Sequence, residues 1–327
     1  MRLGDSLKAF KIKKNDAGQR LDKFLTKSFP ALPPSLAYRF IRTRHIKVNG
    51  KRADFSQVLA EGDLLELYIK DEFLLSAKNR LDFLKASAEL DLVYEDENLL
   101  IANKPAGLLS HPDKNEYRDT LSSRILKYLY ESGHYDPEKE MSFTPALVNR
   151  LDRNTQGLII AAKNAACLRF LNHKMRSGEI RRFYLCAVQG SLAKESDTLE
   201  DAMIKDRQEN KVEIKKSAKA QNKDFKKAKT KYKVLAQVPG QSLLEVELIT
   251  GRSHQIRVHL ANLGNPIIGD IKYGYRPKEK TDKTSPLALL SYKLIFNFSQ
   301  ADPAFQYLKG RVFELDSSDF AAKFTLP

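Results

Sequence analysis

The 327-residue sequence has only two cysteines, no tryptophan and no apolar run long enough to cross a membrane. Cys167 and Cys186 lack CxxC spacing, so the sequence predicts neither a disulfide framework nor a thiol redox motif. The six histidines form no HExxH motif and no cluster with cysteine, which disfavours a zinc site. The N-terminus has no apolar core of the kind found in a secretory signal. We therefore expect a cytoplasmic protein that needs no metal or cofactor.

Positive charge, in contrast, is in excess, with 56 Lys+Arg against 41 Asp+Glu and a net charge of +15. Residues 20–52 contain nine cations and one acidic residue, and residues 205–233 contain twelve cations and four acidic residues. The rest of the chain is therefore close to neutral, and the two patches favour a polyanionic partner. We expect residues 205–233 to form a solvated loop or a long hairpin, although lysine-rich surface without a ligand would have the same composition.

The first basic patch has the pattern of two helices and a small sheet. Apolar residues between Leu21 and Phe29 follow helical spacing, and a second helix is expected from Ser35 to Arg44 after a proline-rich loop. Alternating residues 46–48 precede Asn49-Gly50, a strong signal for a two-residue hairpin turn, and residues 65–69 alternate again.

This order resembles the S4-type RNA-binding domain over about residues 18–70. The residues that carry the resemblance are Arg20 to Leu25, Ser35 to Arg44 and Ile46 to Lys51. The resemblance implies that the basic second helix and the turn after it meet RNA phosphates through Arg39, Arg42, Arg44 and Lys47. A solvated basic helix face without a ligand is the alternative.

The rest of the chain alternates short strand patterns, such as residues 99–102, 158–162, 183–188 and 244–248, with helical patterns such as residues 121–130. This alternation predicts a single α+β domain that is large enough to bury a core. We place an N-terminal module at residues 1–75, a linker at 76–89 and the second domain at 90–327. Residues 71–87 carry leucines without strand alternation and could be helical.

A carboxylate in the second domain lies between two arginines, in the segment Arg150-Leu151-Asp152-Arg153 just before an apolar strand. Neighbouring guanidinium groups favour the charged form of Asp152, and a charged carboxylate needs no base to act as a nucleophile. Alone, however, such a segment is more often a structural ion pair.

A helix is predicted after Gly251, because Ile256, Leu260 and Leu263 recur at helical spacing and Ser253 could act as its N-cap. Arg252 and His254 at its start are suitable for a phosphate, and Arg257 lies one turn further along. Solvated cations on a capped helix are the alternative explanation for these residues.

Taken together, these segments resemble the pseudouridine synthases of the large bacterial family that modifies ribosomal and transfer RNA. The match spans about residues 90–295. It rests on Arg150 to Leu158, on Gly251 to His259, on the loop Lys104 to Gly107, on the Tyr184 strand, and on Gly269-Asp270 and Tyr273-Gly274. The resemblance implies a catalytic domain built on a mixed, mainly antiparallel sheet. It also implies that this domain acts on RNA without a metal or cofactor.

The resemblance implies a role for each matched residue. Asp152 attacks the target uridine, Tyr184 stacks on the uracil and Arg257 orients Asp152. Arg150 fills the gap left by the flipped nucleotide, while Arg252, His254 and Lys104 contact RNA. The target base has to leave its stack, because the glycosidic bond is inaccessible inside a helix.

Two positions depart from the family pattern, since Asn149 replaces a usual histidine and Gln156 a usual serine. We interpret both as changes in the hydrogen bonds that support the loop. A non-catalytic RNA-binding or ribosome-assembly protein on the same fold is the alternative function, and DNA binding is disfavoured because no base-reading helix-turn-helix is evident. The S4-like module favours 23S rRNA as the substrate, with tRNA as the alternative, and we expect a monomer.

Overall fold

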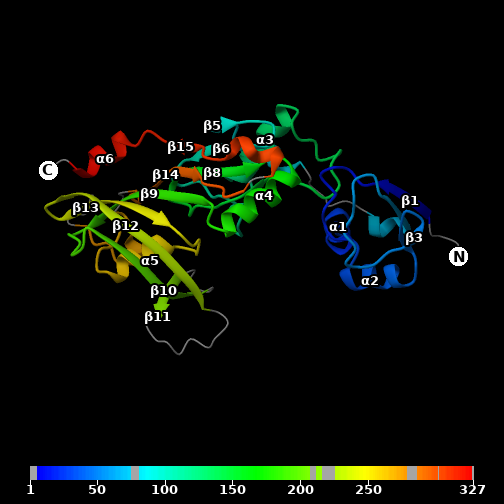
Figure 1. The fold of residues 1–327 in the computed structure, drawn as a ribbon, viewed down its shortest axis with the longest axis horizontal. Helices are drawn as coiled ribbons and strands as arrows, with labels where there is room; N and C mark the ends of the chain where they lie inside the picture. Colours follow the sequence, from blue (N-terminus) through cyan, green and yellow to red (C-terminus); the bar gives the residue numbers. More distant parts are fainter. Residues whose placement is uncertain are drawn as a thin grey trace.

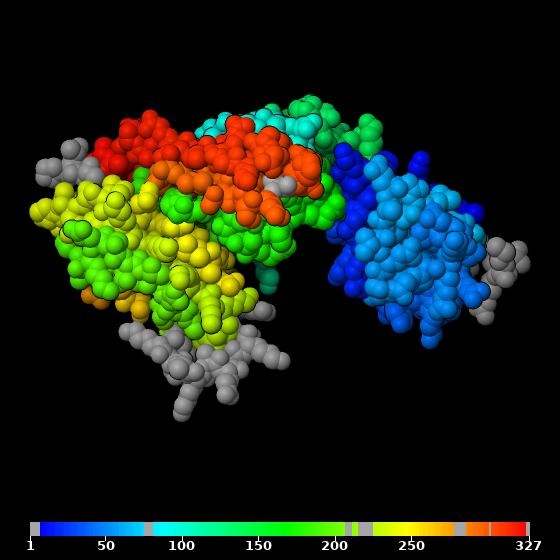
Figure 2. Space-filling view, in the orientation of Figure 1, coloured from blue at the N-terminus to red at the C-terminus, as the bar shows by residue number. Residues whose placement is uncertain are grey.

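The computed structural model describes residues 6–74, 81–206, 211–215, 225–277, 286–300 and 302–325. They form a small N-terminal module and a larger body built on one extended sheet (Figure 1). In the space-filling view the module, in blue, is a separate lobe beside the green part of the body (Figure 2). Among the described residues, no helix is long and apolar enough to span a membrane.

The described part of the module contains two helices packed on a four-stranded sheet with the order β1-β4-β2-β3. The predicted helices and the hairpin are confirmed, and Asn49 and Gly50 both have positive φ (53° and 72°), as the tight turn requires. Strand β1, which the sequence did not predict, pairs antiparallel with β4. The elements are β1 (Ser6–Lys11), α1 (Leu21–Ser28), α2 (Pro34–Arg42), β2 (Ile46–Val48), β3 (Lys51–Arg52) and β4 (Leu64–Ile69).

The described part of the connection to the body contains two short 3-10 helices. These are η1 (Asp71–Leu74) and η2 (Asp82–Lys85), and Phe83 of η2 joins the core of the body. Residues 75–80, which include the start of the expected linker, lie outside the described residues.

Eleven strands form the sheet of the body within the described residues, in the order β11-β10-β12-β13-β9-β14-β8-β6-β5, with β15 beside β14 and β7 beside β8. All neighbouring pairs are antiparallel except β14 with β8, so the expected mixed, mainly antiparallel sheet is confirmed. The strands are β5 (Leu92–Glu95), β6 (Leu99–Lys104), β7 (Ala146–Leu147), β8 (Gln156–Ala162), β9 (Ile180–Gln189), β10 (Ser196–Asp206), β11 (Lys211–Lys215), β12 (Lys226–Val238), β13 (Gln241–Leu248), β14 (Leu289–Phe296) and β15 (Val312–Glu314).

Helices cover both faces of this sheet because its central strands are apolar on both sides. Along β6, Leu100 and Ala102 join the core beneath α3 and α5, whereas Leu99 and Ile101 join the core beneath α4. The remaining helices are α3 (Leu121–Glu131), α4 (Ala165–Arg176), α5 (Gln255–Asn262), α6 (Ser318–Thr325), η3 (Ile271–Tyr273) and η5 (Pro303–Leu308).

The second basic segment is mostly strand. Strands β10, β11 and β12 pair antiparallel and project below the body in Figure 1, which agrees with the expected long hairpin. Residues 207–210 and 216–224 of this segment lie outside the described residues.

Polar side chains join the module to the body. Asp16 is fully buried, and its Oδ1 accepts hydrogen bonds from the Ser142 backbone nitrogen (3.0 Å) and hydroxyl (2.6 Å). On the other side, Arg169 of α4 donates from Nη1 to the Ala17 carbonyl oxygen (3.1 Å). The module therefore contacts the body both in the loop before β7 and along α4.

Candidate active site

Asp152 lies in the loop between β7 and β8, and its backbone is fixed on both sides. Before it, the buried Ser110 hydroxyl donates to the Leu151 carbonyl oxygen (2.7 Å) and accepts from the Leu151 nitrogen (3.1 Å). After it, Lys104 Nζ donates to the Arg153 carbonyl oxygen (2.9 Å). The end of β6 and the segment after it therefore hold the loop that carries Asp152 in one position.

This arrangement corrects the expected role of Lys104. Its side chain is fully buried, and Nζ also donates to the carbonyl oxygens of Pro105 (2.8 Å) and Leu108 (2.7 Å). Burial lowers the pKa of Lys104 to about 8, against the attraction of Asp152. With its ammonium group enclosed by backbone carbonyls, Lys104 supports the loop and is not exposed to RNA.

The two departures from the family pattern flank the Asp152 loop, but only Asn149 supports it. Asn149 is buried, accepts from the Ile160 nitrogen (2.8 Å) and donates to the Leu158 carbonyl oxygen (3.2 Å), so it ties the loop to β8. Gln156 is exposed. Next to it Gly157, at φ 120°, leaves no room for a side chain, because a Cβ there would lie 2.2 Å from the Ser291 carbonyl oxygen of β14.

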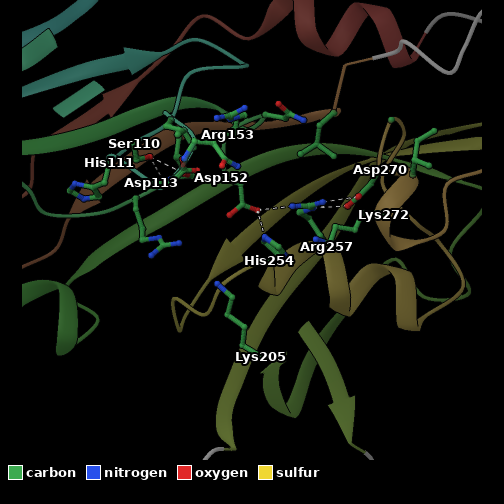
Figure 3. A pocket seen from close by; sticks show the side chains of 18 of the residues that line it. Ser110, His111, Asp113, Asp152, Arg153, Lys205, His254, Arg257, Asp270 and Lys272 are labelled. Carbon is green, nitrogen blue, oxygen red and sulfur yellow. Dashed lines mark hydrogen bonds and ion pairs between the residues drawn. The ribbon is translucent and has the colours of Figure 1, made fainter. Parts of the chain in front are cut away.

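Arg257 of α5 connects two carboxylates. Its Nη1 donates to Asp152 Oδ2 (3.0 Å), while Nε and Nη2 donate to the two oxygens of the buried Asp270 (2.7 and 2.8 Å), as Figure 3 shows. Burial works to lower the pKa of Arg257, but hydrogen bonds and attraction from both carboxylates outweigh it and raise that pKa. The guanidinium group is therefore always charged and cannot rotate freely, which orients the carboxylate of Asp152.

The start of α5 differs from the prediction that Ser253 caps it. The helix begins at Gln255, and the residue before it, His254, has left-handed backbone geometry (φ 51°). The backbone nitrogen of Arg252 donates to Gln255 Oε1 (3.0 Å), so the side chain of the first helix residue satisfies this donor. The Arg252 side chain is exposed and donates from Nε to the Lys227 carbonyl oxygen (3.0 Å).

His254 lies close to Asp152 and ends a chain of hydrogen bonds that begins at β11. The Val212 nitrogen of β11 donates to the Tyr273 hydroxyl oxygen (2.9 Å), which lies 2.7 Å from His254 Nδ1. The other ring nitrogen, Nε2, lies 3.9 Å from Asp152 Oδ2. Burial lowers the pKa of His254 more than Asp152 raises it, so the ring is neutral near pH 7.

Tyr184 of β9 is buried, with 4% of its surface exposed, and burial raises the pKa of its hydroxyl group. It lines a small cavity of about 50 Å³ together with Arg150, Asp152 and Thr155. The structure therefore brings Tyr184 next to Asp152, as the resemblance implied.

A larger cavity of about 790 Å³ opens above Asp152, a volume in the range of nucleotide-sized ligand sites. Cations from several elements line it, and in Figure 3 Lys205 of β10 extends toward His254 and Asp152. Lys205, Lys272, Asp270 and Tyr273 had no predicted role. Asp270 and Tyr273 lie in matched family segments, which was the available signal, whereas the two lysines carry no motif.

The predicted cations of the module lie outside this site. Arg39, Arg42 and Arg44 are exposed on and just after α2, and none forms an ion pair with a described residue. Lys47 is half-buried, with Nζ 4.9 Å above the centre of the Tyr68 ring. They form an exposed cationic surface on the module, here called the α2 surface.

Comparison with known proteins agrees with this arrangement. Residues 98–262 match the family model described as RNA pseudouridylate synthase, and residues 19–65 match the S4 domain. The chain therefore belongs to the RNA pseudouridylate synthase family and carries an N-terminal S4 domain.

Relatives with similar sequences cover most of the chain. It is 32% identical over 93% of its length to an uncharacterized RNA pseudouridine synthase of Mycoplasma capricolum, of which 95% is covered. It is 30% identical over 81% of its length to ribosomal large subunit pseudouridine synthase C of Vibrio vulnificus (79% covered), and 31% identical over 87% to synthase D of Borreliella burgdorferi (83% covered).

Among solved structures, human RNA pseudouridylate synthase domain containing 4 has the same fold, with a TM-score of 0.54 and 20% identity over 71% of this chain and 90% of that one. The chain is thus an RNA pseudouridine synthase, an isomerase whose partner is RNA.

Proposed function

We propose that this synthase isomerises uridines in large-subunit ribosomal RNA and that Asp152 is its nucleophile. Relatives named as ribosomal large subunit synthases C and D support the substrate, because the chain is similar to them over most of its length. Ribosomal RNA as substrate also favours action in the cytoplasm. We further propose a monomer with domain boundaries at residues 1–75, 76–89 and 90–327.

One observation carries the assignment of Asp152. Its Oδ2 is held by Arg257, whereas its Oδ1 has no hydrogen bond to a described residue and the residue lines the large cavity. The other buried carboxylate of the site, Asp270, has both oxygens bonded to Arg257. Asp152 is therefore the carboxylate that is oriented by one oxygen and available through the other.

In the proposed reaction the target uridine leaves its stack and enters the cavity at Asp152. The carboxylate either attacks C1′ or removes a proton to give a glycal, and in both routes the bond between C1′ and N1 breaks. The uracil then turns and a bond forms between C1′ and C5. As it forms, the bond between the carboxylate and C1′ breaks in the first route, or the proton returns from the carboxylate to C2′ in the second, and the C5 proton is released to the solvent. Tyr184 stacks on the ring during this rotation, while the exposed Arg150, on the cavity rim, fills the place of the flipped base.

Tritium release from RNA labelled at uridine C5 tests the proposal. The wild type should release tritium from large-subunit rRNA and not from bulk tRNA, and Asp152→Asn should release none from either. Release from tRNA alone would overturn the substrate class. Equal release by the variant would overturn the nucleophile, and binding of rRNA without release by the wild type would favour a non-catalytic RNA-binding protein.

A further inference from the structure

A second cavity, of about 450 Å³, adjoins the Asp152 loop and has no role in the reaction described above. Arg150 and Asp152 line both this cavity and the larger one. The other charged lining residues are Arg176, Arg182 and Arg252, and Asp152 is the sole carboxylate among the described lining residues. We call this space the arginine cavity.

Arg182 is the unusual member of this set, because its charge is buried without a carboxylate partner. Only 9% of its surface is exposed, Nη2 donates to the Leu248 carbonyl oxygen (3.1 Å), and Nε has no hydrogen-bond partner among the described residues. A buried guanidinium group is costly unless a counter-charge compensates it.

Its neighbour on β9 shows the ordinary arrangement. The side chain of Arg181 is 40% exposed, and its Nε lies 2.7 Å from Glu247 Oε1. The sequence thus places a paired arginine and an unpaired one side by side on opposite faces of one strand. The unpaired one lines the arginine cavity.

The backbone opposite Arg182 is adapted to this guanidinium group. A Cβ at Gly251 would lie 3.0 Å from Arg182 Nη1, so the glycine leaves space for the group at the cavity wall. Arg252 follows directly and approaches from the start of α5, while Arg176 approaches from the last residue of α4. Three separate elements therefore direct positive charge into one space.

The exposed face of α4 leads from the S4 domain to this cavity. Arg169, His173 and Arg176 are exposed and follow one another by four and three residues, which places them on one helix face. Arg169 contacts Ala17 of the S4 domain, and Arg176 lines the cavity. A row of basic side chains on α4 thus extends from the contact with the S4 domain to the arginine cavity.

We propose that the arginine cavity is a phosphate subsite, in which a backbone phosphate of the RNA next to the flipped uridine is bound by Arg176, Arg182 and Arg252. Arg182 supplies the buried counter-charge, and the two others close around the phosphate from the rim. This inference rests on the proposed function for the identity of the RNA. The subsite itself fixes the position of the strand relative to Asp152.

The first test compares Arg182→Met with the matched control Arg181→Met. Binding of a large-subunit rRNA fragment is measured over a range of salt concentrations in an Asp152→Asn background, so that no turnover occurs. The logarithm of the binding constant falls as the logarithm of the salt concentration rises. Loss of one phosphate contact in Arg182→Met should make this slope shallower by about 0.7 to 0.9, whereas Arg181→Met should keep the slope of the Asp152→Asn protein. An equal slope for the two variants would overturn the subsite.

Kinetics in the otherwise native protein provide a readout that a purely structural role would not give. Arg182→Met should raise KM for the rRNA fragment about tenfold while kcat changes less than twofold, because the phosphate contact is made in both the bound and the reacting state. A fall in kcat with unchanged KM would contradict the proposal. Failure of the wild type to isomerise any RNA would refute the proposed function but leave the binding result standing.

Inorganic phosphate distinguishes an RNA phosphate from a free anion. At constant ionic strength, phosphate in place of chloride should raise the melting temperature of the wild type but not that of Arg182→Met. A second outcome is that phosphate raises the melting temperature of the wild type while Arg182→Met binds RNA as tightly as the wild type does. That result would assign the cavity to a free anion and overturn the RNA subsite. If Arg182→Met does not fold, Arg176→Gln replaces it, because Arg176 is an exposed residue of the same cavity. Arg176→Gln should show the same effects on the salt slope and on KM. Unchanged values of both would overturn the proposal.

Discussion

The α2 surface and the active site both depend on arginine, but they hold it in opposite ways. Arg39, Arg42 and Arg44 are exposed and have no ion pair among the described residues, whereas Arg257 is fixed between Asp152 and Asp270. Exposed cations can follow the phosphates of many RNA sequences, because their attraction requires no fixed geometry. A cation that must orient a nucleophile needs defined geometry, and here a buried carboxylate provides it.

This difference separates affinity from chemistry. Changes on the α2 surface should alter how tightly RNA binds and leave the reaction rate at saturating RNA intact. Changes around Arg257 should lower the reaction rate at saturating RNA and leave RNA affinity intact.

The largest effect among the supporting residues is expected for Arg257→Lys. Lysine keeps the charge but cannot bridge Asp152 and both oxygens of Asp270, so the nucleophile loses its orientation. We expect kcat to fall about 100-fold. RNA affinity should stay within twofold of the wild type, measured by filter binding in the same preparation. A parallel loss of affinity would show that Arg257 also holds RNA.

On the α2 surface, the combined change Arg39→Gln, Arg42→Gln and Arg44→Gln should weaken rRNA binding at least tenfold and lower the salt slope by about 2. The rate at saturating RNA should equal that of the wild type. As a control, Lys8→Gln with Lys70→Gln removes two cations of the same domain that already lie near Asp71 and Glu72, and should have a much smaller effect. A lower saturated rate in the triple variant would break the separation.

Acid should destabilise the body through protonation of His259 of α5. This residue is fully buried, and burial lowers its pKa to about 4. The unfolded chain binds this proton near pH 6.5 and the folded chain only near pH 4, so stability falls as the pH drops through this window. Between pH 7.5 and 5.5 the free energy of unfolding should fall by about 1 kcal/mol from this group. Denaturant titrations of the wild type and of His259→Gln measure it, and an equal pH dependence in both would contradict the assignment.

The smallest effect is expected for Tyr273→Phe. It removes the hydroxyl group between Val212 and His254 and leaves the ion pair of Arg257 intact. Of the two hydrogen bonds lost, the one to His254 adjoins Asp152, and its loss should reduce kcat about two- to fivefold. RNA affinity should be unchanged, and Tyr117→Phe, at an exposed tyrosine, serves as the control. A loss as large as that of Arg257→Lys would mean that the hydrogen-bond chain, rather than the ion pair, positions Asp152.

Local patterns were sufficient to predict the helices and the hairpin of the S4 domain. The apolar face of α1 and the Asn49-Gly50 turn are properties of neighbouring residues. Strand β1 was missed, since it exists through pairing with β4 and its own sequence is short and basic. Helix α4 was missed as well, and its buried face includes Lys174, a residue that periodicity assigns to the surface.

The resemblance to the family predicted the neighbourhood of Asp152, Tyr184 and Arg257, and the structure brings these residues together. It did not predict what holds them. Lys104 was expected to contact RNA, but its ammonium group is enclosed by three carbonyl oxygens. The clamp by Asp270 follows from tertiary contact between η3 and α5, which no spacing in the sequence reveals.

The central claim is that one carboxylate performs the chemistry while separate cations hold the RNA. Single-turnover isomerisation of an rRNA fragment with excess Asp152→Asn enzyme, counted as pseudouridine by nucleoside chromatography, tests it most directly, with RNA affinity measured on the same preparation. We predict no pseudouridine and an affinity within twofold of the wild type. Pseudouridine at the wild-type rate, or a loss of affinity as large as the loss of activity, would contradict the account.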